Sequence, residues 1–265
     1  MPSMAAPLVT LTTDFGADSP YVAQMKGVLL RLCPAAKIVD ITHSIAPQNV
    51  RQGAVVLADA TPWFPAKTLH VAVVDPGVGT QRRMIYAELG EQRYLLPNNG
   101  LLSRLARVAP PRRVFALENP DYFLPQVTST FHGRDMLAPT AAHLLLGAAP
   151  ETLGPPLDQL VDLHWPEPQR QADRLAGEIL YVDSFGNLIS NITAEHLASL
   201  GGEPSNRIVE IAGRQISGVQ ATYGFSQPGD LIALLDSHGR LEVAVVNDSA
   251  ARRLDAGEGA SVTVF

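Results

Sequence analysis

The spacing of apolar residues changes regularly along the N-terminal part of the chain. Three runs rich in β-branched residues, at 8–14, 37–43 and 68–75, have the length and composition of buried strands. Between them, residues 21–32 and 49–60 carry apolar side chains three and four positions apart, which is the spacing of an amphipathic helix. This order of strand, helix, strand, helix and strand predicts an α/β domain with a parallel sheet wrapped by helices.

Shorter segments complete this domain. Further strands are expected at 84–89, 93–96 and 112–117, and further helices are expected to end near residue 108 and to span 130–146.

The pattern of residues along the sequence changes near residue 153. A stretch punctuated by proline follows, and beyond it short β segments alternate with turns rich in Gly, Asp and Asn. These segments are 177–182, 188–192, 207–211, 215–219, 230–235, 241–246 and 261–265, with one short helix expected at 194–200. The pattern predicts a small β-barrel or sandwich. We therefore divide the chain into an N-terminal α/β domain at 1–160, a linker at 161–173 and a C-terminal β-barrel domain at 174–265.

The composition of the chain limits which binding partners and which cellular compartment are expected. The net charge of −6 and the pI near 5.6 argue against non-specific binding to nucleic acid, which needs clustered Lys and Arg. The single cysteine, Cys33, cannot form an intrachain disulfide and suits a reducing compartment. No apolar run approaches the roughly 18 residues that cross a membrane. We therefore expect a soluble, cytoplasmic protein.

Two of the predicted parallel strands end on a carboxylate. Asp14 follows the first strand, and Asp75 follows the third strand directly before a Pro-Gly-Val-Gly turn. Because the carboxyl ends of parallel strands meet at one edge of a sheet, both side chains are expected to face one crevice. A carboxylate there can accept hydrogen bonds from the two adjacent hydroxyls of a ribose. The glycines match neither a dinucleotide fingerprint nor a phosphate-binding loop, which disfavours a phosphorylated nucleotide.

A second group of reactive side chains lies at the predicted start of the 130–146 helix. His132 stands beside a glycine there, where it would be accessible and near the positive end of the helix dipole. A histidine can lose its proton, whereas an arginine such as Arg82 cannot. Asp75 would then orient His132 or a water molecule while Arg82 holds an anion. The structural alternative is a capped turn at Asp75, a solvated Arg82 and an ordinary surface histidine.

A metal site is the rival interpretation. Residue types that bind metals occur in several predicted loops: Asp14, His43, His70, Asp75, His132 and Asp135. His70 falls in the middle of a strand, however, and no His-x-His or His-Glu-x-x-His spacing occurs. We therefore expect no metal.

In the C-terminal domain, the turn at 183–187 combines an acid, an aromatic ring and an amide. Asp183 could face an ammonium group, Phe185 a flat ring, and Asn187 a base edge or a hydroxyl. The alternative is an ordinary turn rich in Asp and Asn. The hairpin at 237–242 carries polar groups that could bind a carboxylate or could simply be solvated.

Seven motifs occur in order along the chain, and together they are far more specific than any one of them. They are TDFG (13–16), DITHSI (40–45), VDPGVG (74–79), PNNGLL (97–102), FHGRD (131–135), DSFGN (183–187) and DSHGRLE (236–242). In combination they resemble the S-adenosyl-L-methionine hydroxide adenosyltransferases, relatives of the enzymes that fluorinate or chlorinate the same molecule. The resemblance covers residues 8–265.

The resemblance implies an N-terminal α/β domain, a C-terminal β-barrel domain and a homotrimer with active sites between neighbouring subunits. It also implies that Asp75, Arg82 and His132 act together on a water molecule, a set that the halogenating relatives lack. Substrate contacts are implied for Asp14 (ribose hydroxyls), Asn187 (adenine), Phe131, Phe185 and Tyr223 (adenosine pocket), Asp183 (methionine ammonium), Ser237 (methionine carboxylate), Glu242 and Val245. Where the fluorinating relative has an arginine beside that serine, this chain has His238, so the methionine end is expected to be held less firmly.

The implied reaction is attack by water, or by hydroxide formed in place, on ribose C5′ of S-adenosyl-L-methionine, giving adenosine and L-methionine without a cofactor. The leaving group is a neutral thioether and needs no general acid, so the protein must supply a positioned, deprotonated nucleophile. Either Asp75 or His132 could accept the proton. The other interpretations are a non-catalytic adenosine-binding or S-adenosylmethionine-binding module and a metal-dependent hydrolase.

Overall fold

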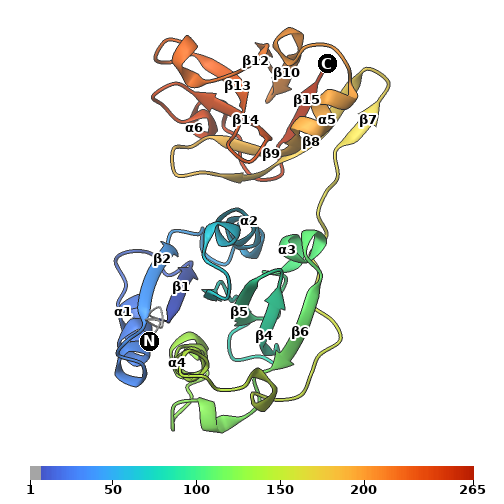
Figure 1. Ribbon diagram of the computed structural model, residues 1–265. Coiled ribbons are helices and arrows are strands. Elements are labelled where there is room, and N and C mark those ends of the chain that lie inside the picture. The colour runs from blue at the N-terminus through green and yellow to red at the C-terminus, as the bar shows by residue number, and fades with distance from the viewer. Residues whose placement is uncertain (1–6) are drawn as a thin grey trace, which may run out of the picture. The chain divides into compact units, whose positions relative to one another are not determined.

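The chain divides into two compact units, Met1–Leu163 and His164–Phe265, and the computed structural model describes residues 7–265 (Figure 1). The first unit is a sheet with helices, and the second is built mainly of strands. This arrangement confirms the predicted fold class of an α/β domain followed by a smaller β-barrel-like domain.

The sheet of the first unit has six strands in the order β2-β1-β3-β5-β4-β6. They are β1 (Leu8–Thr13), β2 (Lys37–Thr42), β3 (Leu69–Val73), β4 (Met84–Leu89), β5 (Gln92–Pro97) and β6 (Pro111–Ala116). Strands β2, β1, β3 and β5 pair in parallel, whereas β4 runs antiparallel to both of its neighbours. The short connection between β4 and β5 allows only a hairpin, because a parallel pair needs a crossover of a dozen or more residues. The predicted parallel sheet is therefore extended into a mixed one.

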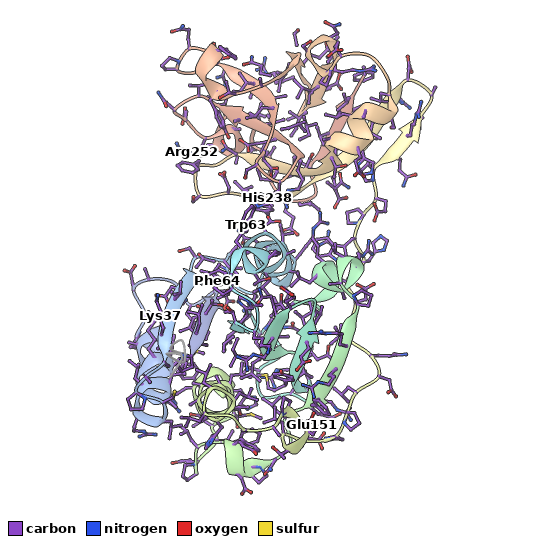
Figure 2. The ribbon with its side chains drawn as sticks, viewed as in Figure 1. Lys37, Trp63, Phe64, Glu151, His238 and Arg252 are labelled. Carbon is purple, nitrogen blue, oxygen red and sulfur yellow. The ribbon has the colours of Figure 1, made fainter. Side chains whose placement is uncertain are left out.

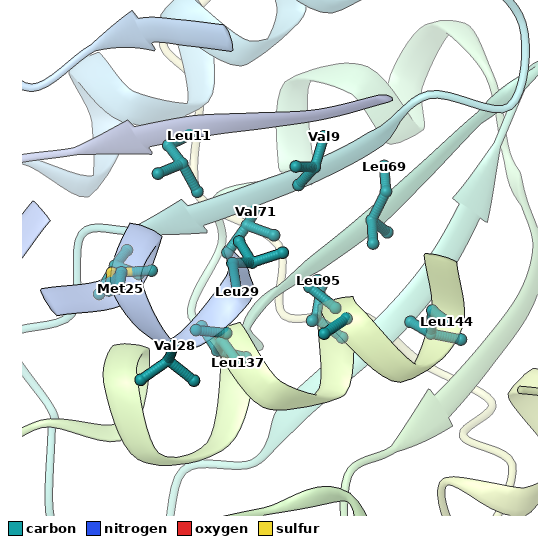
Figure 3. Close-up of a cluster of buried hydrophobic side chains, with 14 of the residues drawn as sticks. Val9, Leu11, Met25, Val28, Leu29, Leu69, Val71, Leu95, Leu137 and Leu144 are labelled. Atoms are coloured by element: carbon teal, nitrogen blue, oxygen red, sulfur yellow. The ribbon is translucent and has the colours of Figure 1, made fainter. Parts of the chain in front are cut away.

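Helices cover both faces of this sheet. They are α1 (Tyr21–Leu32), α2 (Val50–Ala60), α3 (Ser103–Val108) and α4 (Ala138–Leu145). Met25 and Leu29 of α1 pack with Val71 in one buried cluster, which Figure 3 shows together with Leu137 and Leu144. Ala72 belongs to the cluster on the other face, together with residues of α2 and α3. Side chains of β3 thus alternate between two covered faces, which explains why the strand reads as a continuous apolar run.

The second unit is formed by a nine-stranded sheet. Its strands are β7 (Gln169–Gln171), β8 (Arg174–Val182), β9 (Leu188–Thr193), β10 (Ile208–Ile211), β11 (Arg214–Ser217), β12 (Val219–Gln220), β13 (Leu231–Leu235), β14 (Arg240–Val245) and β15 (Ser261–Val264). The order runs from β11 at one end to β12 at the other, with β7 added beside β8. Because Gly218 alone separates β11 from β12 in the sequence, the two ends of the sheet lie close together and the sheet is nearly closed.

Besides β7, which lies within the stretch at 161–173 that was expected to be a linker, three local predictions differ from the structure. A single strand was expected at 215–219, but the chain forms β11 and β12 there. One helix was expected in the second unit, but α6 (Ala250–Leu254) follows α5 (Ala194–Ser199); at five residues it is too short for an apolar period.

The third difference concerns the helix expected at 130–146. It begins as a π-helix at Gly133–Leu137 and continues as α4, because Pro139 has no N–H for the regular hydrogen-bond pattern. Among the residues that the structure describes, no helix combines the length and apolar character needed to cross a bilayer.

Candidate active site

Asp75 lies in the tight turn that follows β3. The turn is closed by a hydrogen bond from Val78 N to Asp75 O, 3.2 Å long. Gly79 has φ +79°, and a Cβ built on it would lie 2.6 Å from the carbonyl oxygen of Ser129. Only glycine fits this close approach, which holds the turn against the segment leading to His132.

Arg82 joins the other two members of the predicted catalytic set. Its Nε donates to both carboxylate oxygens of Asp75, at 2.8 and 2.9 Å, and its Nη2 also binds Oδ2. The same Nη2 lies 3.0 Å from Nδ1 of His132. The side chains of Arg82 and Asp75 are 10% and 4% exposed, so this pair is well shielded from water.

The contact with Arg82 determines the state of His132. A guanidinium group can only donate, so Nδ1 of His132 must accept and the neutral ring carries its proton on Nε2. Burial lowers the pKa of His132, and the charge of Arg82 lowers it further, while Asp75 and Asp135 act in the opposite direction. The neutral imidazole is therefore the favoured form near pH 7.

Asp14 and Asp75 face the same cavity, as expected from the ends of their strands. This cavity of about 360 Å³ is also lined by Phe131 and His132. The ring of Phe131 packs edge-on against the rings of Phe15 and Tyr21, with centroids 5.7 and 5.2 Å away. The cavity thus combines the two carboxylates that follow β1 and β3 with a wall of aromatic side chains.

Gln48 is a lining residue that the sequence did not reveal. Its backbone N–H donates to Oδ2 of Asp14 at 2.7 Å. Gln48 has φ +65°, a left-handed conformation that is costly for a residue other than glycine and that orients this N–H. The Asp14 carboxylate is therefore held in place by backbone from another loop.

Two of the candidate metal ligands, His70 and Asp135, are engaged elsewhere. His70 is fully buried in β3 with Nδ1 2.8 Å from Thr10 Oγ1, and burial lowers its pKa to about 4. Asp135 is also fully buried and accepts hydrogen bonds from Thr128 and Arg134. Within residues 7–265, no group of three or more His, Cys, Asp or Glu is placed to hold a metal ion.

In the second unit, the carboxylate of Asp183 holds its own turn together. Oδ1 accepts from the backbone N–H groups of Phe185 and Asn187 at 2.8 and 2.9 Å, and Oδ2 accepts from the Asn187 side chain at 3.0 Å. Gly186, with φ +85°, lies so close to Ser249 that a Cβ would come within 2.1 Å of the Ser249 hydroxyl oxygen. The turn expected to face an ammonium group is thus first an Asp-stabilised turn packed against the start of α6.

A larger cavity, of about 610 Å³, lies beside this turn. It is lined by the predicted residues Phe185, Asn187, Tyr223 and Val245, and by residues 246–249 and Arg252. Figure 2 labels Arg252, which belongs to α6. Prediction missed residues 246–249 and Arg252 because α6 itself was not recognised. Phe185 is 78% exposed. The contact of this apolar ring with water is unfavourable, and an aromatic ligand stacked on the ring would remove it.

Two further predicted residues form a partly buried polar pair. The hydroxyl of Tyr223 donates to Oε1 of Glu242, whose side chain is buried in β14. Burial raises the pKa of Glu242, and the hydrogen bond from Tyr223 lowers it in part. Ser237 instead lies at the exposed tip of the β13–β14 hairpin, with Oγ 3.3 Å from Nδ1 of His238.

Comparison with known proteins places the chain in a family. The model of the SAM hydroxide adenosyltransferase N-terminal domain matches residues 9–154, and that of the C-terminal domain matches residues 177–263. The chain therefore belongs to the SAM hydroxide adenosyltransferases.

Individual relatives cover nearly the whole chain. An (R)-S-adenosyl-L-methionine hydrolase of Thermus thermophilus is 41% identical, covering 97% of this chain and 99% of that protein. A fluorinase of Nocardia brasiliensis is 29% identical, covering 97% and 96%. The crystal structure of an uncharacterized conserved protein from Thermotoga maritima superposes with a TM-score of 0.90 at 34% identity, covering 97% and 99%.

Proposed function

We propose that this chain hydrolyses S-adenosyl-L-methionine to adenosine and L-methionine, by attack of water on ribose C5′. The observation that carries the proposal is the linked Asp75, Arg82 and His132 set, two members of which line a cavity with Asp14. Relatives at 33–41% identity are named (R)-S-adenosyl-L-methionine hydrolases, so we extend the (R) sulfonium configuration to the substrate of this chain.

Each member of the set has a distinct role in the proposed reaction. His132 donates its Nε2–H to the oxygen of the water, which orients a lone pair toward C5′. Because Arg82 occupies Nδ1 of His132, the carboxylate of Asp75 is the group that accepts the proton of the water. The C5′–O bond forms as the C5′–S bond breaks, and the electron pair leaves on sulfur as a neutral thioether. The reaction needs neither a metal nor a cofactor.

The substrate contacts are divided between the two units. Asp14 binds the ribose hydroxyls and Phe131 lines the adenosine pocket from the first unit. The proposed contacts in the second unit are Phe185, Tyr223, Asn187 and Val245 for the adenosine end, and Asp183, Ser237 and Glu242 for the methionine end. The oxygens of Asp183 already accept hydrogen bonds within the turn, but a carboxylate has lone pairs for an ammonium as well.

We further propose a cytoplasmic homotrimer in which neighbouring subunits complete each site. The lone cysteine suits a reducing compartment, and the division of the candidate residues between two units is what a shared site requires. Mixing Asp75→Ala and Asn187→Ala proteins should restore part of the activity through hybrid sites. A fully active protein that sediments as a monomer would contradict the shared site.

The function itself is tested by incubating the protein with the substrate, with and without a chelator, and separating the products by chromatography. We expect adenosine and methionine in equal amounts under both conditions. Binding without turnover would favour a non-catalytic module, and loss of turnover with the chelator would favour a metal-dependent hydrolase.

A further inference from the structure

The DITHSI segment places a histidine directly beside the Asp14 turn. His43 Nδ1 lies 2.9 Å from Thr13 Oγ1, and His43 Nε2 lies 3.1 Å from Oδ1 of Asp40. Lys26 donates to the other oxygen of Asp40 at 2.5 Å. The negative charge of Asp40 beside Nε2 favours the tautomer of His43 that carries its proton there, which leaves Nδ1 to accept from the Thr13 hydroxyl.

His43 contacts both ends of the turn at residues 13–16, which contains Asp14 and is called the Asp14 turn here. At the start of the turn, Thr13 Oγ1 also accepts from Phe15 N, at 3.3 Å. At its end, Gly16 N donates to the backbone carbonyl of His43 at 2.8 Å. The two parallel strands β1 and β2 are neighbours, so the residues that follow them lie side by side and can make both contacts.

Burial separates the residues that support the turn from those that can meet a ligand. A hydroxyl, an imidazole and a carboxylate in series resemble a nucleophilic triad, but Thr13 is completely buried. Asp14 and Phe15, the two residues held between the contacts of His43, both line the cavity. The series therefore acts on the position of these two side chains.

We propose that His43, oriented by Asp40 and acting through Thr13, is a positioning residue that fixes Asp14 and Phe15 for the ribose of the substrate. The inference rests on the proposed function, in which Asp14 binds the ribose hydroxyls. A ribose contact made equally in the ground state and the transition state changes KM more than kcat. Loss of one such hydrogen bond corresponds to roughly a tenfold change in affinity.

Matched substitutions of His43 separate its two contacts. We expect His43→Ala to raise KM about tenfold with kcat nearly unchanged. His43→Asn keeps a polar atom near the Nδ1 position and should restore most of the affinity, whereas His43→Gln keeps one near the Nε2 position and should not. Thr13→Val removes the hydroxyl at constant size and should reproduce His43→Ala. Thermal unfolding of each variant shows whether the fold is retained.

A double substitution distinguishes positioning from a general structural effect. If His43 acts mainly through Asp14, then adding His43→Ala to Asp14→Ala raises KM by much less than the factor that His43→Ala produces alone. Multiplied effects, an unchanged KM in His43→Ala, or equal KM values for His43→Asn and His43→Gln would each overturn the inference. Calorimetric titration of the same variants with adenosine measures the ribose contact without turnover. If the wild-type chain proves unable to hydrolyse the substrate, the proposed function fails while the dissociation constants still decide the role of His43.

Discussion

The cavities of the two units differ in how their functional groups are held. In the first unit, Arg82 ties Asp75 to His132, and these charges are fixed before any ligand arrives. In the second unit, Phe185 stands 78% exposed beside a wider cavity. Fixed dipoles and charges lower a barrier because they need no rearrangement during reaction. An exposed ring instead contributes binding, since a ligand removes its apolar surface from water. We therefore propose that the chemistry takes place in the first unit, which also binds the ribose through Asp14, and that the second unit contributes recognition alone.

The largest expected effect is on the chemistry of the first unit. Asp75→Asn keeps the shape of the side chain but removes the proton acceptor, so kcat should fall by about 10²–10⁴-fold while KM changes little. Steady-state kinetics measure both quantities. Asp121→Asn, which neutralises an exposed carboxylate of the same unit, is the matched control and should leave both unchanged. A rise in KM at constant kcat for Asp75→Asn would reverse the division between the units.

A smaller effect, of the opposite kind, is expected in the second unit. Phe185→Ala should raise KM roughly tenfold and leave kcat largely intact, since stacking of a base on an aromatic ring contributes about 1–3 kcal/mol. Phe225, which is 81% exposed in the same unit, provides the control substitution Phe225→Ala. Equal KM values for the two variants would remove the evidence for recognition by this cavity.

The smallest expected effect is a dependence on pH through His132. The pKa of His132 lies below the ordinary value of about 6.5, so the ring is neutral near pH 7. We therefore expect kcat to decline only as the pH falls below about 6.5. Protonation would place a cation against Arg82 and break the bond to Nδ1. Between the lowered pKa of His132 and about 6.5, this residue binds a proton in the unfolded chain but not in the folded chain. The free energy of unfolding therefore also decreases as the pH is lowered through this range. Measuring kcat and urea unfolding as functions of pH checks the two expectations. A decline of kcat centred above pH 6.5 would contradict the neutral state of His132.

The sequence predicted those features that depend on local periodicity or on the ends of strands. Helix α1 occupies its predicted residues because its apolar spacing is regular and Pro34 ends it. Asp14 and Asp75 share a cavity because parallel strands end at one edge. The role of the Asp183 carboxylate within its own turn depends on backbone N–H directions, which composition does not specify. The same holds for Gln48, whose left-handed backbone aims an N–H at Asp14.

We propose above all that the Asp75, Arg82 and His132 set activates water, and not a halide ion, toward ribose C5′. A halide about 4 Å from an isolated carboxylate is repelled by roughly 4 kcal/mol at an effective dielectric constant near 20, which is about three powers of ten in occupancy before the attraction of Arg82 is counted. The direct test is mass spectrometry of the products formed in water labelled with oxygen-18 and containing molar chloride. We predict adenosine with the heavy oxygen at its 5′ position, unlabelled methionine and no chlorinated nucleoside. Formation of 5′-chloro-5′-deoxyadenosine in proportion to the chloride added would contradict the claim.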